Sequence, residues 1–127
     1  MISHGIDIID IKRVENIYKK YSLKFLKKVF TEQEIEKNTF QKFSSSRALE
    51  KIAGRFATKE AAYKALELNS KIGIGVHDFI ITENRFGNPS LILSEKVKKL
   101  IKTEFKISVS ISHEKDFAIA SVIIFYY

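Results

Sequence analysis

Two periods of apolar residues divide this chain into a helical first half and a strand-rich second half. In the first half apolar residues recur every three to four positions, which predicts helices at 11–21, 22–30, 31–42 and 47–68. A short apolar run at 6–11 precedes these helices and predicts a strand. Further strands are expected at 79–83, 90–93, 107–112 and 117–125, with one helix between them at 95–103. Helices followed mostly by antiparallel-looking strands are typical of the α+β class.

Polar residues stand where several of these helices would begin. Asp10 precedes the first helix and is a favoured capping residue. Thr31 is followed three residues later by Glu34, the spacing of a capping box. The polar run 43–46 predicts a loop in which one serine caps the longest helix.

The chain has 127 residues, which fits one domain over 1–127, and its 45% hydrophobic content is that of a globular protein. It has no cysteine, which excludes thiolate metal sites and disulfides. The net charge of +7 favours anionic partners: nucleic acid, phosphorylated cofactors, an acidic protein or a membrane surface. The sequence has no signal-peptide pattern and no apolar run long enough to span a membrane, so we expect a cytoplasmic protein.

Glu60 is the most informative residue of the longest predicted helix. On a helical wheel it lies about 20° from Leu49, in the middle of the apolar stripe. Lys64 follows one turn later on the same side. One interpretation is a surface ion pair that stabilises the helix by a few tenths of a kcal/mol. The other is a charged site, because a carboxylate that faces a core is costly unless a cation or a metal meets it.

Asp7 repeats this anomaly on the first predicted strand, between Ile6 and Ile8. It could simply accept backbone hydrogen bonds at the end of a strand. Alternatively, two inward carboxylates on different elements, Asp7 and Glu60, meet the minimum for Mg²⁺, which takes oxygen ligands and completes its shell with water and substrate phosphates. The sequence has no histidine pair at the spacing that zinc requires.

Further candidate binding residues lie near these carboxylates or at turns. Arg55 and Lys59 are one turn apart on a flank of the long helix, where charges are usually just solvated. Beside a carboxylate pair they would also serve as phosphate partners, with arginine the better bidentate donor. His113 ends a predicted strand, and Gly87-Asn88-Pro89 is an ordinary turn motif, so neither indicates a function by itself.

Three blocks of the sequence have the residues and the order of a known enzyme family. They are GIDIIDIKRV at 5–14, GRFATKEAAYKA at 54–65 and VSISHEKDFAIA at 109–120. FTEQE at 30–34 and the turn at 87–89 lie between them in the expected order. Together they resemble the holo-[acyl-carrier-protein] synthases, a family of phosphopantetheinyl transferases. The resemblance covers essentially the whole chain and implies an antiparallel sheet packed against a long central helix.

The resemblance implies transfer of the phosphopantetheine arm of coenzyme A to a serine of apo acyl carrier protein, with release of adenosine 3′,5′-bisphosphate. Such a transfer depends on positioning and charge neutralisation more than on covalent catalysis. By resemblance Asp7 and Glu60 hold Mg²⁺, and Lys64 neutralises the phosphates. The serine proton goes either to Glu60 or to a metal-bound water, and the residues leave both routes open.

The resemblance also assigns binding surfaces and an assembly. Arg55, His113, Gly87 and Pro89 match positions that contact the nucleotide and its 3′-phosphate in this family. The docking surface for the acidic carrier is matched by basic residues of the first helices: Arg13, Lys19, Lys20 and Lys24. The family forms homotrimers with active sites between protomers, so the terminal strand 117–127 would lie partly at an interface.

A small basic nucleic-acid-binding domain is the alternative from another class. It would account for the net charge, and the 12% of aromatic residues would offer stacking surfaces. It leaves Asp7 and Glu60 unexplained, because carboxylates in a phosphate groove oppose binding. A third possibility, a subunit that kept the assembly and lost the chemistry, is disfavoured by the intact Asp7, Glu60 and Lys64.

Overall fold

The computed structural model of the chain describes residues 1–37, 46–67 and 73–127. The helices are α1 (Ile11–Tyr21), α2 (Leu23–Val29), α3 (Glu32–Lys37), α4 (Ser46–Ala65) and α5 (Glu95–Lys98). The strands are β1 (Ile2–Asp10), β2 (Phe79–Glu83), β3 (Pro89–Leu93), β4 (Phe105–His113) and β5 (Phe117–Tyr126). A short 3₁₀ turn, η3 (Val76–Asp78), precedes β2. The α+β class predicted from the sequence is confirmed.

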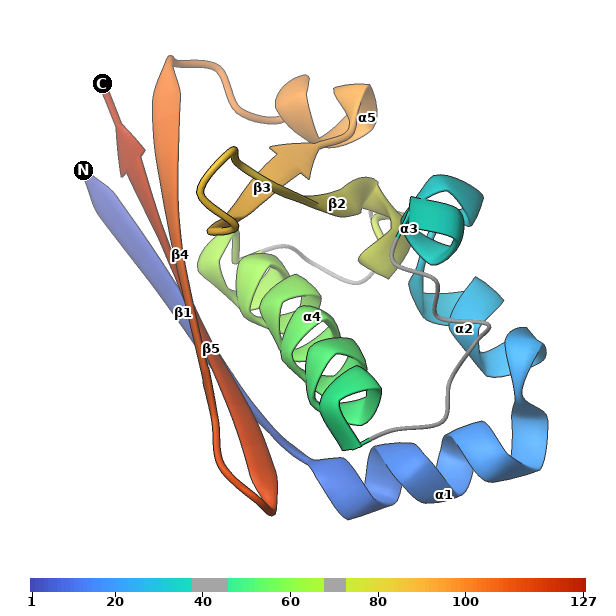
Figure 1. The fold of residues 1–127 in the computed structure, drawn as a ribbon. Helices are drawn as coiled ribbons and strands as arrows, with labels where there is room; N and C mark the ends of the chain where they lie inside the picture. The colour runs from blue at the N-terminus through green and yellow to red at the C-terminus, as the bar shows by residue number, and fades with distance from the viewer. Residues whose placement is uncertain (38–45, 68–72) are drawn as a thin grey trace.

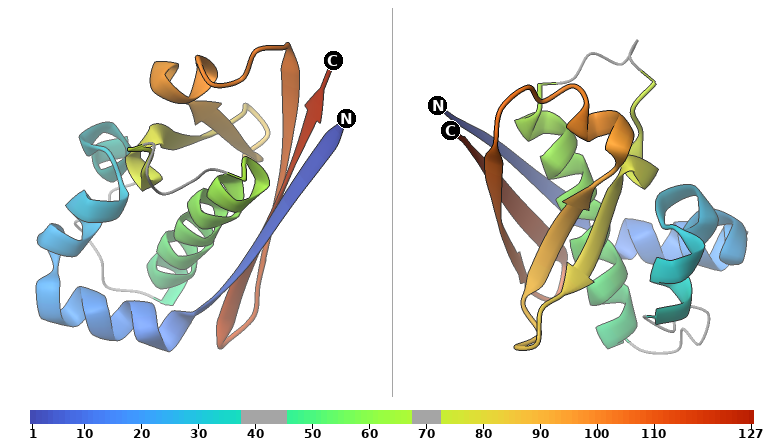
Figure 2. Two further views of the ribbon diagram at one scale, coloured as in Figure 1. Left: turned by 180° about the vertical axis from the view of Figure 1, so that it is seen from behind. Right: turned by 90° about the horizontal axis from the view of Figure 1, so that it is seen from above.

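The molecule is built around α4, which lies across one face of an antiparallel sheet (Figure 1). The strand order of this sheet is β1-β5-β4, and the hairpin β2–β3 forms a second small sheet. Helices α1 to α3 run around the side of α4 that is turned away from the sheet (Figures 1 and 2). The apolar core is therefore divided into one cluster between α4 and the two sheets and another beneath α1 to α3.

Small residues allow α4 to lie unusually close to the sheet. Its fully buried positions include four alanines: Ala57, Ala61, Ala62 and Ala65. Gly5 of β1 lies directly against two of them. A Cβ atom built on Gly5 would be 1.9 Å from the carbonyl oxygen of Ala61 and 2.6 Å from the amide nitrogen of Ala65. Backbone thus packs on backbone at this point. Because strand side chains alternate, Asp7 faces α4 from the same side of β1 as residue 5.

The predicted caps begin the helices as expected. The side chain of Asp10 accepts hydrogen bonds from the amides of Lys12 at 2.9 Å and Arg13 at 3.4 Å. Thr31 and Glu34 form the capping box: the amide of Thr31 donates to Glu34 at 3.0 Å, and the amide of Glu34 donates to the hydroxyl of Thr31 at 3.2 Å. Both contacts are local in sequence, which is why a spacing rule could find them.

Several boundaries differ from the prediction. β1 begins at Ile2 rather than at residue 6, because β5 supplies a pairing partner along its whole length, from Phe117 to Phe125. The helix expected at 95–103 ends at Lys98, because the amides of Leu100 and Ile101 bond three residues back instead of four. The long helix ends at Ala65 instead of residue 68. The predicted loop at 43–46, except for Ser46, and the predicted end of the third helix lie outside the described residues; Ser46 is the first residue of α4.

The outer face of the main sheet carries no helix among the described residues (Figures 1 and 2). The side chains that β1 and β5 present on this face are nevertheless mostly apolar, and the large ones are between 36% and 61% exposed, whereas β4 presents Lys106 and three serines. The large apolar residues are Ile2, Ile6, Ile8, Phe117, Ile119, Ile123 and Phe125. We call these residues the outer apolar face.

None of the helices in the described ranges has the length and apolarity needed to cross a membrane.

Replacing Gly5 by alanine should lower the free energy of unfolding by about 3 kcal/mol, because the added methyl group meets backbone atoms that cannot move aside. Urea unfolding followed by circular dichroism measures this loss. Gly75→Ala is the matched control, since a Cβ there has no heavy atom within 4 Å and its φ of −134° suits any residue. Equal stability of the two variants would contradict the close packing of β1 on α4.

Candidate active site

Asp7, Glu60 and Lys64 meet where β1 crosses the C-terminal half of α4. The ammonium of Lys64 donates to Asp7 Oδ1 at 2.9 Å and to the carbonyl oxygen of Ile6 at 3.0 Å. Lys64 therefore pairs with Asp7. The surface-pair interpretation required Lys64 to pair with Glu60, and it does not. The side chain of Asp7 is only 17% exposed, whereas that of Lys64 is 55% exposed. The ion pair lies at the edge of the sheet with its cation open to solvent.

Glu60 is a half-buried carboxyl group, and no described residue forms a hydrogen bond or ion pair with its side chain. Burial raises the pKa of Glu60 above its usual value, the negative charge of Asp7 raises it further, and Lys64 opposes both effects. Asp7 on β1 and Glu60 on α4 are therefore close enough for the charge of Asp7 to make Glu60 harder to ionise. A cation between them would relieve that repulsion.

The donor set fits one kind of metal site. Mg²⁺ is usually held by one or two protein carboxylates, with water and substrate phosphates as its remaining ligands. The described residues contain no group of three or more side chains that could hold a metal. A closed structural site is thus excluded within the described ranges, whereas an open site formed by Asp7 and Glu60 matches the chemistry of Mg²⁺.

A second functional region is a cleft of about 640 Å³ between the first half of α4, the hairpin β2–β3 and the end of β4. Gly87, Pro89 and His113, all predicted binding residues, line it together with Arg55. It also contains cations and carboxylates that sequence reasoning did not single out: Arg47, Lys51, Glu50 and Glu83. The cleft thus brings together all the residues predicted to contact a nucleotide, with the exception of Lys59.

Apart from Arg47, the charged side chains of this cleft lie in pairs. The guanidinium of Arg55, only 6% exposed, donates to Glu83 Oε1 at 2.5 Å and to the carbonyl oxygen of Ile81 at 3.5 Å. Burial lowers the pKa of Arg55, and the charge of Glu83 opposes that shift. Lys51 lies 3.5 Å from the same oxygen of Glu83, and His113 Nδ1 lies 3.5 Å from Glu50. Arg55 is therefore not solvated on the flank of the helix, and Glu83 provides its counter-charge.

Lys59, predicted beside the nucleotide, lies in the core. Its side chain is fully buried, and its ammonium donates to Glu34 at 2.7 Å and to the carbonyl oxygen of Val29 at 2.9 Å. The other oxygen of Glu34 accepts from the amide of Ile81 at 3.1 Å. Burial lowers the pKa of Lys59, and the hydrogen bond to Glu34 opposes the shift. The ion pair joins α4 to α3 and β2, so Lys59 does not face the cleft.

The two functional regions lie on different sides of α4 within one chain. None of Asp7, Glu60 and Lys64 lines the cleft. Glu60 and Arg55 are five positions apart, which turns them about 140° from one another on a helix. One chain therefore presents the carboxylate pair towards β1 and the basic cleft towards β2–β3.

The predicted carrier-docking residues lie on α1 and α2, away from the sheet. Arg13, Lys20 and Lys24 are exposed, and so is Lys19, which pairs with Glu15 at 3.3 Å. A shallow crevice of about 280 Å³ lies between the two helices. It is lined by three apolar or aromatic residues and two lysines: Ile17, Tyr21, Phe25, Lys24 and Lys28.

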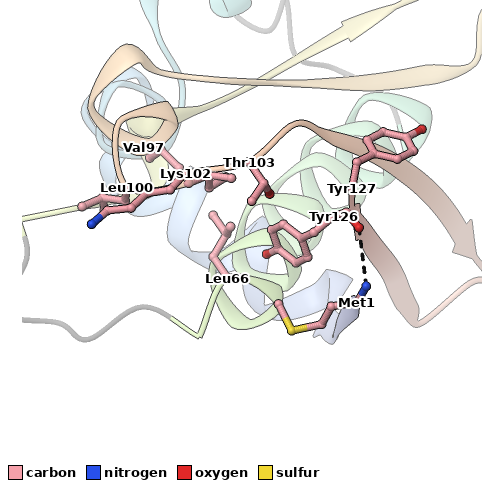
Figure 3. Close-up of a pocket in the computed structure, with 9 residues that line it drawn as sticks. Met1, Leu66, Val97, Leu100, Lys102, Thr103, Tyr126 and Tyr127 are labelled. Carbon is pink, nitrogen blue, oxygen red and sulfur yellow. Dashed lines mark hydrogen bonds between the residues drawn. The ribbon is translucent and has the colours of Figure 1, made fainter.

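A third hollow, of about 440 Å³, lies at the other end of α4, beside both termini (Figure 3). Its walls are mostly apolar and aromatic, with Leu66, Leu100 and Tyr126 among them, and the amino group of Met1 donates to the carbonyl oxygen of Tyr126 at 3.4 Å. No carboxylate and no predicted site residue lines it. It therefore has no part in the candidate site.

Two partners in these regions could not be found from local pattern. Glu34 was visible only as a capping residue, and Glu83 only as the last residue of a strand. The cations Arg47 and Lys51 did carry a signal, because with Arg55 they repeat every four residues and so share one face of the helix.

Comparison with known proteins gives one consistent family. Residues 3–122 match the family model of the 4′-phosphopantetheinyl transferase superfamily. The holo-[acyl-carrier-protein] synthase of Ehrlichia chaffeensis is 38% identical over 95% of this chain and 94% of its own, and that of a Geobacillus species is 38% identical over 98% and 96%.

Solved structures agree. The holo-(acyl-carrier-protein) synthase of Bacillus anthracis in complex with CoA (3′,5′-ADP) superposes with a TM-score of 0.76 at 35% identity, covering 96% of this chain and 94% of its own. The Helicobacter pylori enzyme in complex with coenzyme A has a TM-score of 0.80 at 34% identity, covering 98% and 99%. The family-model match, the full-length sequence similarity and the shared fold lead to one assignment: the chain belongs to the 4′-phosphopantetheinyl transferase superfamily.

Proposed function

We propose that this chain, as one domain over 1–127, transfers the phosphopantetheine group of coenzyme A to a serine of apo acyl carrier protein and releases adenosine 3′,5′-bisphosphate. The main support is the facing pair Asp7 and Glu60, with Lys64 beside it, in a chain whose full-length relatives are holo-[acyl-carrier-protein] synthases. Coenzyme A is the ligand named for two of the similar structures. We propose a cytoplasmic location for the protein, as expected from the sequence.

Asp7 and Glu60 would hold Mg²⁺. The charge of Asp7, which makes Glu60 harder to ionise, supports that role because a cation would offset it. When bound, the metal neutralises the pyrophosphate and polarises the phosphorus that the serine hydroxyl attacks. Lys64 has three N–H donors and a solvent-exposed side chain, so it can turn from Asp7 to a phosphate oxygen and stabilise the charge that grows on the leaving group. Glu60 would be the protein carboxylate of this site that can accept the serine proton, the alternative acceptor being a water molecule.

The cleft would hold the nucleotide end of coenzyme A. Arg55 is the residue best suited to a phosphate there, because a guanidinium binds two phosphate oxygens at once. His113, Gly87 and Pro89 line the same cleft. A nucleotide bound there is held by positions on three elements, which fixes its orientation before the reaction.

The exposed cations on α1 and α2 would form the docking surface for the carrier: Arg13, Lys19, Lys20 and Lys24. Acyl carrier proteins are acidic, and charge complementarity speeds their encounter with a basic surface and selects the orientation of docking. The crevice between the two helices offers apolar contacts among these lysines.

The active form would be a homotrimer. Two observations support this assembly: no helix or strand of the described residues covers the outer apolar face, and the carboxylate pair and the cleft lie on different sides of α4. Apolar faces of this size usually mark interfaces. In a ring of three chains, the carboxylate pair of one protomer would meet the cleft of the next, and each interface would complete one active site.

Glu60→Gln should reduce transfer about 100-fold while leaving the fold intact, because the side chain keeps its shape and loses the charge that holds the cation. The measurement is the intact mass of apo acyl carrier protein after incubation with coenzyme A and Mg²⁺. Glu104→Gln, an exposed glutamate far from the site, makes the same charge change and should react like the wild type. Near-wild-type transfer by Glu60→Gln would rule out its role as a metal ligand.

Mixing two inactive variants tests the shared active site. Glu60→Gln lacks one half and Arg55→Gln the other, so trimers formed from equal amounts should regain about one quarter of the wild-type sites, those that combine the two intact halves. Chains are co-refolded, and native mass spectrometry verifies that mixed trimers have formed. Activity no higher than the sum of the separate variants would show that each site is formed by one chain.

Arg13→Glu should raise the KM for the carrier about tenfold and leave the affinity for coenzyme A unchanged, since it reverses a charge on the docking surface alone. Transfer rates at varied carrier concentration measure the first quantity, and calorimetry the second. Lys99→Glu applies the same reversal at the end of α5 and serves as the control. An unchanged KM would move the docking surface elsewhere on the molecule.

A further inference from the structure

Two carboxylates lie inside a cleft whose proposed ligand carries a phosphate, where negative charge opposes binding. Of these, Glu83 is the more tightly engaged. One of its oxygens accepts from Arg55 at 2.5 Å and lies 3.5 Å from the ammonium of Lys51. Two of the cations that a phosphate in the cleft would bind are therefore already paired with this oxygen of Glu83.

The two partners of this ion pair differ in exposure. The side chain of Arg55 is 6% exposed and that of Glu83 is 41% exposed. The guanidinium of Arg55 also donates a hydrogen bond to the carbonyl oxygen of Ile81. The guanidinium is thus fixed within the protein, and the carboxylate covers it on the side of the solvent.

The position of Glu83 in the hairpin also allows its side chain to turn away from Arg55 and Lys51 into solvent. It is the last residue of β2 and pairs across the hairpin with Pro89, which has no N–H to offer the ladder. The turn that follows is held independently, because the side chain of Asn84 accepts from the amides of Phe86 at 2.9 Å and Asn88 at 3.0 Å. Turning the carboxylate into solvent breaks the ion pair with Arg55 and Lys51 and leaves the hairpin as it is.

We propose that Glu83 is an internal competitor for the phosphate of the nucleotide. In the free protein its carboxylate satisfies Arg55 and Lys51, and the 3′-phosphate of coenzyme A must displace it, which the greater charge of a phosphate monoester allows. The product, adenosine 3′,5′-bisphosphate, keeps that phosphate, so the returning carboxylate weakens product binding and speeds its release. This inference rests on the proposed function, since it takes the 3′-phosphate to bind at Arg55.

The test is calorimetric titration of the wild type and of Glu83→Gln with two nucleotides. Adenosine 3′,5′-bisphosphate should bind Glu83→Gln about five- to tenfold more tightly, the effect of one removed charge at a partly exposed ion pair. Adenosine 5′-phosphate, which lacks the 3′-phosphate, should bind both proteins within about twofold of one another. Glutamine can still accept a hydrogen bond from Arg55, so the fold is retained, and thermal unfolding verifies this. Glu95→Gln, which removes the same charge on α5, is the control and should match the wild type.

The outcomes separate the two proposals. Weaker or unchanged binding of the bisphosphate by Glu83→Gln, with normal binding by the wild type, overturns the competitor role; weaker binding would make Glu83 a residue that orients Arg55. An equal gain for both nucleotides overturns it too, because the effect would then be general electrostatics. In an Arg55→Gln background the gain should disappear, since the competition is for that guanidinium. A wild type that binds neither nucleotide would overturn the proposed function itself, and this inference with it.

Discussion

The contact between Gly5 and α4 is the constraint on which the rest of the site depends. Residue 5 has no side chain, the facing helix positions are alanines, and β1 therefore rests directly on the backbone of α4. Two residues along the strand, Asp7 faces the same side of β1. It accepts a hydrogen bond from Lys64 and lies close to Glu60, which precedes Lys64 by one helical turn. The geometry of the carboxylate pair therefore follows from the packing distance between β1 and α4.

Three cations of α4 are bound to carboxylates on three other elements, and their exposure increases along the series. Lys59 is fully buried against Glu34 of α3, Arg55 is nearly buried against Glu83 of β2, and Lys64 is half exposed against Asp7 of β1. The same type of contact therefore serves different purposes. A buried pair fixes elements relative to one another, because separating it leaves a charge in the core, whereas an exposed pair can exchange partners with a ligand at small cost.

Local rules predicted those parts of the molecule whose partners are close in sequence. Asp10 and the pair Thr31 and Glu34 were found as caps because each contact spans three residues or fewer. Glu60 was found because a helical wheel needs only the period of the helix. The long-range partners were not found: nothing near Lys59 indicates that Glu34 would reach it, and the period of α4 treats Lys59 and Arg55 alike. The early start of β1 likewise depends on β5, more than a hundred residues away in the chain.

The buried pair of Lys59 and Glu34 also limits how this sequence can evolve. Losing either partner alone leaves an uncompensated charge among apolar side chains, a loss of about 3–5 kcal/mol that is comparable to the whole stability of a small domain. A lineage can therefore cross from this pair to an apolar one only by changing both codons nearly together, although they stand 25 positions apart. Lys59 and Glu34 should therefore change together in evolution: a descendant sequence should have both residues or neither.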